Sequence, residues 1–243
     1  MNEMNCYLET KNLNKRYGSF EAVKNMNVHI YKGDIYGLIG PNGAGKTTLM
    51  KMIIGFAGPT SGEIVLNSEK KGEGVIGNLI ESPGIYGHLT AFENMMLKAK
   101  AQGVYNKDEL LDILEFVGLS NVPKKKAGKF SLGMKQRLGI ALALIGDPEI
   151  LILDEPTNGL DPQGIIEVRE LIHKLRAERN MTIMISSHIL SELQKVANVF
   201  GIISNGELVM EVTSDELMEK YNGDSGALEE FYLDVVRGGK KVC

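Results

Sequence analysis

The sequence predicts an α/β protein with a parallel core sheet, flanked by an antiparallel β layer and by a helical segment. Three observations support this prediction. After residue 150, apolar strand-like runs alternate with helical stretches, which is typical of a parallel sheet. Between residues 7 and 35, short strand-like runs are separated by turns at glycines, which indicates antiparallel pairing. From residue 90 to about 143, the apolar spacing is that of helices.

The individual elements can be assigned in chain order. Strands are predicted at 35–39, 62–66, 75–80, 150–153, 182–186, 200–203 and 207–212, and helices at 47–54, 164–179 and 189–196. In the helical segment, two apolar faces are predicted: Phe92, Met95, Met96 and Ala99, and then Leu110, Leu111, Leu114 and Val117. We expect one domain over residues 5–235, with a helical subdomain at about 82–143, a short helix after residue 214 and a polar tail at 236–243.

Composition excludes several classes of protein. Of the 243 residues, 43% are hydrophobic and 24% are charged, as in ordinary globular proteins. The net charge of −4 shows no basic excess, so no nucleic-acid partner is predicted. Cys6 and Cys243 have no framework spacing, which favours reduced cytosolic thiols. We expect no N-terminal signal, because residues 1–10 are polar, and no apolar run approaches the ~20 residues of a spanning helix. Any membrane role is therefore expected to involve other chains.

A glycine-rich motif, G-x-x-x-x-G-K-T, lies at residues 40–47 between a predicted strand and a predicted helix. Its glycines let backbone N–H groups surround a phosphate, and the helix directs its positive end at the same anion. Lys46 can reach the β- and γ-phosphates, and the Thr47 hydroxyl can ligate Mg²⁺. A simple glycine-rich turn is the alternative, but the lysine and threonine in register favour a nucleotide site. The predicted binding residues are Gly40, Pro41, Asn42, Gly43, Ala44, Gly45, Lys46, Thr47 and Thr48.

Two acids and a histidine follow neighbouring apolar strands. Asp154 and Glu155 end the strand at 150–153, and His188 follows the strand at 182–186. Ligands gather at the carboxyl ends of parallel strands, so these side chains are expected to face the phosphate loop. We assign Asp154 as a Mg²⁺ ligand, Glu155 as the general base that polarises the attacking water, and His188 as a γ-phosphate sensor. Taken alone, the acids could cap a helix and the histidine could be structural.

Phe130-Ser131-Leu132-Gly133-Met134-Lys135-Gln136-Arg137, about twenty residues before Asp154, completes this order of motifs. The chain resembles the ABC-transporter ATPase family over almost its whole length. The segment is similar to the family signature leucine-serine-glycine-glycine-glutamine, with Leu132 and Met134 as departures. The resemblance implies a RecA-like core, with Ser131 and Gly133 binding the γ-phosphate of ATP across a dimer. It also implies that Tyr17 stacks on adenine and that Asp161, in Asn158-Gly159-Leu160-Asp161, belongs to the loop linking the two sites.

The resemblance also implies partners and a place in the cell. Two copies would close head to tail around two Mg-ATP molecules, or one copy would pair with a similar ATPase. The helical subdomain would pass the motion to transmembrane permease subunits, so the chain is expected at the cytoplasmic face of the membrane.

One departure points to a branch of the family. Where most members have a metal-contacting glutamine, this chain has Glu81, in Asn78-Leu79-Ile80-Glu81-Ser82-Pro83. Together with the signature variant, this resembles the branch of bacitracin exporters and lantibiotic-immunity transporters. We therefore expect a peptide-antibiotic cargo and a metal role for Glu81, although Glu81 could also be a solvent-facing loop residue. A motor for a lipid, drug or ion is the main alternative, and a soluble ABC ATPase without a transport role is a further one.

Overall fold

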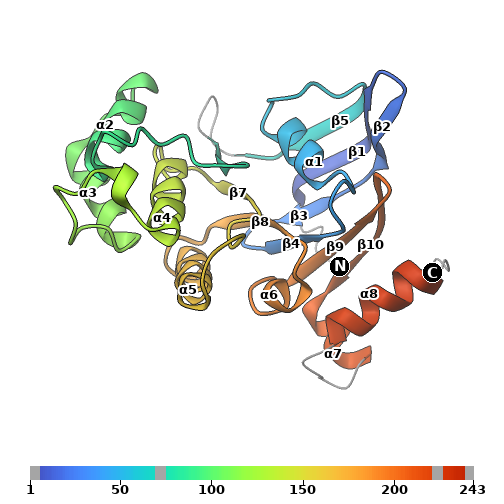
Figure 1. Cartoon of the computed structure of the whole chain (residues 1–243). Helices are drawn as coiled ribbons and strands as arrows, with labels where there is room; N and C mark the ends of the chain where they lie inside the picture. Colours follow the sequence, from blue (N-terminus) through green and yellow to red (C-terminus); the bar gives the residue numbers. More distant parts are fainter. Residues whose placement is uncertain (1–5, 69–74, 221–226, 239–243) are drawn as a thin grey trace.

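The computed structural model describes residues 6–68, 75–220 and 227–238, and it contains two sheets with helices around them (Figure 1). Within these ranges the larger sheet has the strand order β10-β9-β4-β8-β7-β6. Its strands are β4 (Ile35–Ile39), β6 (Ile76–Leu79), β7 (Ile150–Asp154), β8 (Thr182–Ser187), β9 (Val199–Ser204) and β10 (Glu207–Thr213). All neighbours are parallel except the edge strand β10, which is antiparallel to β9. The predicted parallel core sheet is confirmed.

The smaller sheet is the antiparallel layer predicted near the N-terminus. Its strands are β1 (Cys6–Tyr17), β2 (Phe20–Met26), β3 (His29–Tyr31) and β5 (Ser61–Leu66). The long strand β1 pairs antiparallel with each of the other three. β1 therefore holds the layer together.

Helices surround the two sheets, and three of them form a separate lobe. The helices are α1 (Lys46–Ile53), α2 (Ala91–Ala101), α3 (Lys107–Phe116), the 3-10 turn η1 (Ala127–Lys129), α4 (Leu132–Ala143), α5 (Pro162–Arg179), α6 (Leu190–Gln194), α7 (Ser214–Lys220) and α8 (Ala227–Gly238). Figure 1 shows α2, α3 and α4 together as a lobe on the side away from the antiparallel layer. No helix within the described ranges combines the length and the apolar character required to cross a membrane.

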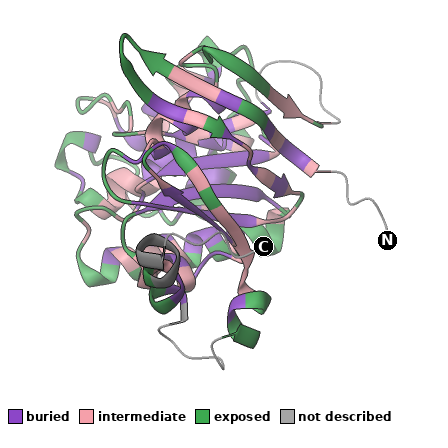
Figure 2. Cartoon of the chain, turned by 90° about the vertical axis from the view of Figure 1, so that its right-hand side faces the viewer, coloured by how far each residue is buried: buried purple, intermediate pink, exposed green. Residues whose placement is uncertain are grey.

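The central sheet is covered on both faces, which explains its continuous apolar strands. Along β7, Ile150 and Ile152 pack toward the antiparallel layer and α1. Leu151 and Leu153 point the other way, toward α5 and the helical lobe. Figure 2 shows these central strands as buried and much of the outer layer as exposed. The phosphate loop therefore extends from a rigid, fully buried platform.

The structure corrects some details of the sequence prediction. Leu111 is 45% exposed, so it does not belong to the apolar face predicted for α3, while Leu110 and Leu114 are buried. Leu110 and Leu114 are one helical turn apart, whereas Leu111 is rotated about 100° from Leu110 and faces solvent. At the C-terminus, α8 continues to residue 238, so the first part of the predicted tail is helical and 239–243 lie outside the described residues.

Candidate nucleotide-binding site

The phosphate loop connects β4 to α1, and close backbone approaches require glycine at two of its positions, Gly40 and Gly45. A Cβ on Gly45 would lie 2.5 Å from the Ala22 carbonyl oxygen, and Gly45 has a φ of 107°. A Cβ on Gly40 would collide with the carbonyl oxygen of Ile203. Larger residues at these two positions would push the loop away from its neighbours, so the loop keeps one shape.

Lys46 begins α1 and folds back over the loop. Its side chain is 6% exposed, and Nζ donates hydrogen bonds to the carbonyl oxygens of Gly40 at 2.7 Å and Pro41 at 3.3 Å. Nζ also lies 3.7 Å from Oε1 of Glu155. The ammonium group is thus positioned between the loop and the acid, where it can neutralise a bound phosphate.

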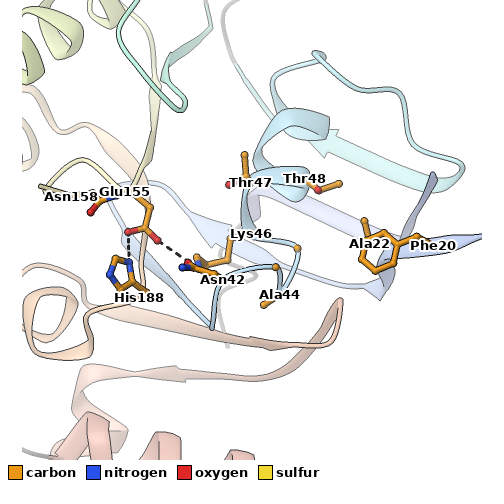
Figure 3. A pocket seen from close by; sticks show the side chains of 12 residues that line it. Phe20, Ala22, Asn42, Ala44, Lys46, Thr47, Thr48, Glu155, Asn158 and His188 are labelled. Carbon is orange, nitrogen blue, oxygen red and sulfur yellow. Dashed lines mark hydrogen bonds and ion pairs between the residues drawn. The ribbon is translucent and has the colours of Figure 1, made fainter. Parts of the chain in front are cut away.

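A pocket of about 310 Å³ opens over the loop (Figure 3). It is lined by Phe20, Ala22, Asn42, Gly43, Ala44, Gly45, Lys46, Thr47, Thr48, Glu155, Asn158 and His188. In Figure 3, Glu155 and His188 lie on one side of the loop, and Phe20 and Ala22 lie on the other. The structure therefore brings together most of the predicted phosphate loop with the predicted base and sensor.

Asp154 and Glu155 are held by a serine that the sequence analysis missed. Asp154 is buried, and its carboxylate accepts hydrogen bonds from the Thr47 hydroxyl at 2.8 Å and the Ser186 hydroxyl at 2.6 Å. The Ser186 hydroxyl accepts in turn from the Glu155 N–H at 2.9 Å. Ser186 is directly opposite Asp154 in the β7–β8 register. The detectable signal was the change from apolar residues to two serines, Ser186 and Ser187, at the end of β8.

Glu155 lies between a cation and an imidazole. Its Oε2 is 2.6 Å from His188 Nδ1, and its Oε1 faces Lys46. Glu155 has a positive φ of 50°, an uncommon conformation for a residue with a side chain, and such conformations cluster at functional sites. Its carboxylate is 21% exposed. It can therefore reach a water molecule in the pocket while remaining oriented by its neighbours.

The hairpin between β1 and β2 presents two aromatic side chains. Tyr17 and Phe20 are paired in register across the hairpin, so both side chains project from the same face. Both are exposed, at 51% and 62%. Phe20 lines the pocket, whereas the Tyr17 ring lies under the Lys15 ammonium group at 5.0 Å. The sequence predicts a role for Tyr17 but not for Phe20 and Ala22, although the turn between Tyr17 and Phe20 indicates that these two residues pair.

The predicted residues Ser131, Gly133 and Asp161 are not part of this pocket. Ser131 caps α4 by accepting from the Met134 N–H at 3.2 Å, and Asp161 caps α5 by accepting from the Gly164 N–H at 3.0 Å. Figure 1 shows α4 and α1 in different parts of the molecule. Within one chain, the signature segment and the phosphate loop are therefore separate.

Glu81 follows β6 and has a positive φ of 64°. Its side chain is 66% exposed and forms a hydrogen-bonded ion pair with Lys51 of α1. The hydrogen bond that Lys51 donates to Glu81 raises the pKa of Lys51. Glu81 is thus paired with Lys51. The Thr47 hydroxyl donates a hydrogen bond to Asp154 at the start of α1. A hydroxyl and a carboxylate beside a phosphate loop are the oxygen ligands that a Mg²⁺–nucleotide complex requires.

Comparison with known proteins agrees with this geometry. The ABC transporter family model matches residues 23–158. Bacitracin transport ATP-binding protein BcrA of Bacillus licheniformis is 51% identical over 89% of this chain and 73% of its own length. Lantibiotic transport ATP-binding protein SrtF of Streptococcus pyogenes is 46% identical over 93% of this chain and 95% of its own length.

Solved structures give the same result. The ATP-binding subunit of an ABC transporter superposes with a TM-score of 0.80 at 29% identity, covering 95% of this chain and 99% of the solved chain. A dimeric ATP-binding cassette bound to ADP and Pi superposes with a TM-score of 0.73 at 25% identity, covering 85% and 98%. The phosphate loop, the acid pair and these similarities together show that the chain belongs to the ABC transporter family, as an ATP-binding and ATP-hydrolysing subunit.

Proposed function

We propose that this chain powers the export or expulsion of a peptide antibiotic of the bacitracin or lantibiotic type, together with membrane-spanning permease subunits. The observation that carries the proposal is the similarity to two transport ATPases named for such peptides, at 51% and 46% identity over most of the chain. The alternative is the same motor with a lipid, drug or ion as cargo. The described side chains account for ATP hydrolysis, and the cargo is assigned through these relatives.

In this proposal the triphosphate of ATP lies in the phosphate loop, with Lys46 against the β- and γ-phosphates. Thr47 and Asp154 would hold Mg²⁺, which offsets the negative charge of the phosphates when it is bound. Glu155 accepts a proton from the water that attacks the γ-phosphorus, and the bond to the β–γ bridging oxygen breaks to give ADP and phosphate. General-base catalysis of this kind contributes ~10²–10⁴-fold in rate.

His188 and Glu81 have supporting roles in the proposal. The imidazole of His188 orients the Glu155 carboxylate through their short contact, and its exposed edge can hydrogen-bond the γ-phosphate. Glu81 pairs with Lys51, which lies one helical turn along α1 from the proposed metal ligand Thr47. We propose that the charge of Glu81 tunes the coupling between nucleotide and permease.

A second copy of the chain would complete the site. Ser131 is exposed at the start of α4, and neither Ser131 nor Gly133 lines the pocket of its own chain. In a head-to-tail dimer, the Ser131 hydroxyl and the Gly133 N–H of one copy would face the γ-phosphate held by the other. The solved dimer of a related cassette supports this arrangement. Tyr17, together with Phe20, would support the adenine, and Asp161 would lie on the loop between the two sites.

A groove between α2 and the end of β6 is proposed to receive the permease. This docking groove has a volume of about 450 Å³ and includes Phe56, Leu79, Tyr86, Leu97, Lys98 and Leu142. Phe56, Tyr86 and Leu97 are exposed at 71%, 54% and 44%, while Leu79 and Leu142 form a buried floor. Exposed apolar side chains around an apolar floor favour burial by another protein. Through this contact the chain would be peripheral to the cytoplasmic face of the membrane.

The test is growth inhibition by bacitracin and by a panel of lantibiotics, in cells that express the chain with its permease subunits. Cells with the Glu155→Gln variant provide the matched inactive control. Protection that requires Glu155 is the expected result. An assembled complex that hydrolyses ATP but protects against none of these peptides would contradict the assigned cargo and favour the alternative cargoes.

A further inference from the structure

One lysine stands out in the docking groove. Asn94, Leu97, Lys98 and Ala101 all line the groove, and their spacing places them on one face of α2. Lys98 is the only charged side chain among the described residues that line the groove. The lining of the groove is therefore made of apolar and uncharged polar residues, apart from the positive charge of Lys98.

Lys98 has no partner for this charge within the described part of the chain. Two other lysines of this region are paired with carboxylates: Lys51 contacts Glu81, and Lys126 lies 3.0 Å from Glu93. Glu81, in the loop beside the groove, is thus already paired with Lys51 and does not pair with Lys98. Burial alone lowers the pKa of Lys98. A partly buried ammonium group without a counter-ion destabilises the isolated chain, and a carboxylate placed beside it would remove that cost.

We propose that the docking groove binds a helical segment of the permease whose apolar face carries one aspartate or glutamate, and that this carboxylate pairs with Lys98. The inference rests on the proposed function, because it specifies the chemistry of the permease contact. The apolar floor at Leu79 and Leu142 fits the apolar face of a helix. An anionic lipid headgroup would satisfy Lys98 but would leave this floor in water, so a protein segment is the better occupant.

The pairing has consequences in both states of the subunit. In the free chain, replacing Lys98 with methionine removes an uncompensated charge from a partly buried position. In the complex, the same change leaves the permease carboxylate buried without a partner. The Lys98→Met variant is therefore expected to melt at the same or a higher temperature than the wild type, and to bind the permease at least about tenfold more weakly.

The decisive experiment is zero-length cross-linking with a carbodiimide, which joins an amine to a carboxylate in direct contact. It is applied to the chain assembled with its co-expressed permease subunits in nanodiscs. Mass spectrometry is expected to find an amide between Lys98 Nζ and an aspartate or glutamate of the permease. Lys98→Arg keeps the positive charge but is not joined by this chemistry, so this variant is expected to assemble normally and to lose that one cross-link.

Three outcomes would overturn the inference. One is a set of cross-links elsewhere in the complex with none at Lys98, together with wild-type affinity of Lys98→Met. Another is a lower melting temperature of Lys98→Met with unchanged affinity, which would indicate a structural role only. The third is binding to phosphatidylglycerol vesicles without permease that depends on Lys98. If the wild-type chain fails to assemble with the permease at all, the proposed function falls along with the inference.

Discussion

At the scale of single residues, Ser186 organises both acids of the site. Its hydroxyl donates to Asp154 and accepts from the peptide N–H of Glu155. Because Ser186 is fully buried, no solvent can replace these two contacts. A small side chain on β8 therefore fixes the positions of both the proposed metal ligand and the proposed base.

We predict that Ser186→Ala lowers kcat more than it lowers ATP affinity. The Asp154 carboxylate would lose a donor and the Glu155 N–H its acceptor, and an unsatisfied buried polar group costs about 1–3 kcal/mol. Steady-state ATPase assays and nucleotide titration separate the two effects. Ser187→Ala is the matched control, since Ser187 accepts from the Ile189 N–H and contacts neither acid. Equal kcat values for these two variants would contradict the role of Ser186.

The pair between Glu81 and Lys51 gives a second prediction. Because Glu81 is exposed, breaking the pair is expected to change the free energy of unfolding by only about 0–1 kcal/mol. Glu81→Gln is nevertheless expected to change permease-coupled transport more than ATP binding, because the charge next to α1 is lost. Transport in vesicles and nucleotide titration measure the two quantities, with Lys51→Gln as the partner variant. An equal loss of transport and binding would rule out a coupling role.

At the scale of elements, α2 begins with a capping box that is tied to the loop before α4. Thr90 accepts from the Glu93 N–H at 3.2 Å, and the Glu93 carboxylate accepts from the Thr90 N–H at 2.6 Å. Glu93 also pairs with Lys126. The hydrogen bond from the Thr90 N–H, with help from Lys126, lowers the pKa of Glu93 from 4.5 to about 2. The helix that lines the docking groove is therefore anchored at its first turn.

This anchor predicts a pH dependence with a definite sign. A carboxyl group with a lowered pKa stabilises the fold above its unfolded pKa of 4.5, and the contribution is lost as the pH falls toward about 2. Glu93→Gln is thus expected to reduce the free energy of unfolding at pH 7, and the difference from the wild type should shrink below pH 4.5. Urea unfolding at several pH values measures this difference. Glu109→Gln, at a partly exposed glutamate in the first turn of α3, is the control, and a difference for Glu93→Gln that is independent of pH would contradict the assignment.

Replacing the capping threonine tests the same anchor without removing a charge. Thr90→Ala is expected to destabilise the protein by about 1 kcal/mol, measured by the same unfolding experiment at neutral pH. No loss of stability would show that the cap is dispensable for α2.

The sequence predicts those features that are local in the chain. The phosphate loop and the acid pair are contiguous motifs, and the buried strand β7 is a continuous apolar run. The fold class and these parts of the site could therefore be predicted from the sequence. Leu111 was misassigned because one apolar residue beyond the periodic face does not change a helical pattern. Phe20, Ser186 and the Glu81–Lys51 pair depend on contacts between distant segments, which a linear pattern does not report. That Lys98 has no charged partner among the described residues becomes apparent only in three dimensions.

At the scale of the whole molecule, the signature and the phosphate loop lie in separate parts of one chain. In the proposed arrangement, the nucleotide site would therefore be complete only when two chains meet. Glu155→Gln keeps Lys46 and the phosphate loop, so it is expected to bind Mg-ATP without hydrolysing it and to accumulate as a dimer. Size-exclusion chromatography with light scattering measures this directly.

A matched control comes from the signature itself. Adding Ser131→Glu to Glu155→Gln places a negative charge where the γ-phosphate would approach, so this double variant is expected to remain monomeric. A monomeric Glu155→Gln protein at saturating Mg-ATP would count against the head-to-tail arrangement.

Helix α4 extends from the signature segment to the proposed docking groove. Ser131 caps one end, while Gly139 lies in the docking groove, where a Cβ would be 2.8 Å from Pro83. Eight residues of α-helix at 1.5 Å each separate these points by about 12 Å. An α-helix of this length bends little. A displacement of α4 at the proposed docking groove would therefore also displace the signature segment at the start of the helix. The proposed coupling between permease and nucleotide would then require no hinge inside the helix, only rotation of the helical lobe as a rigid body.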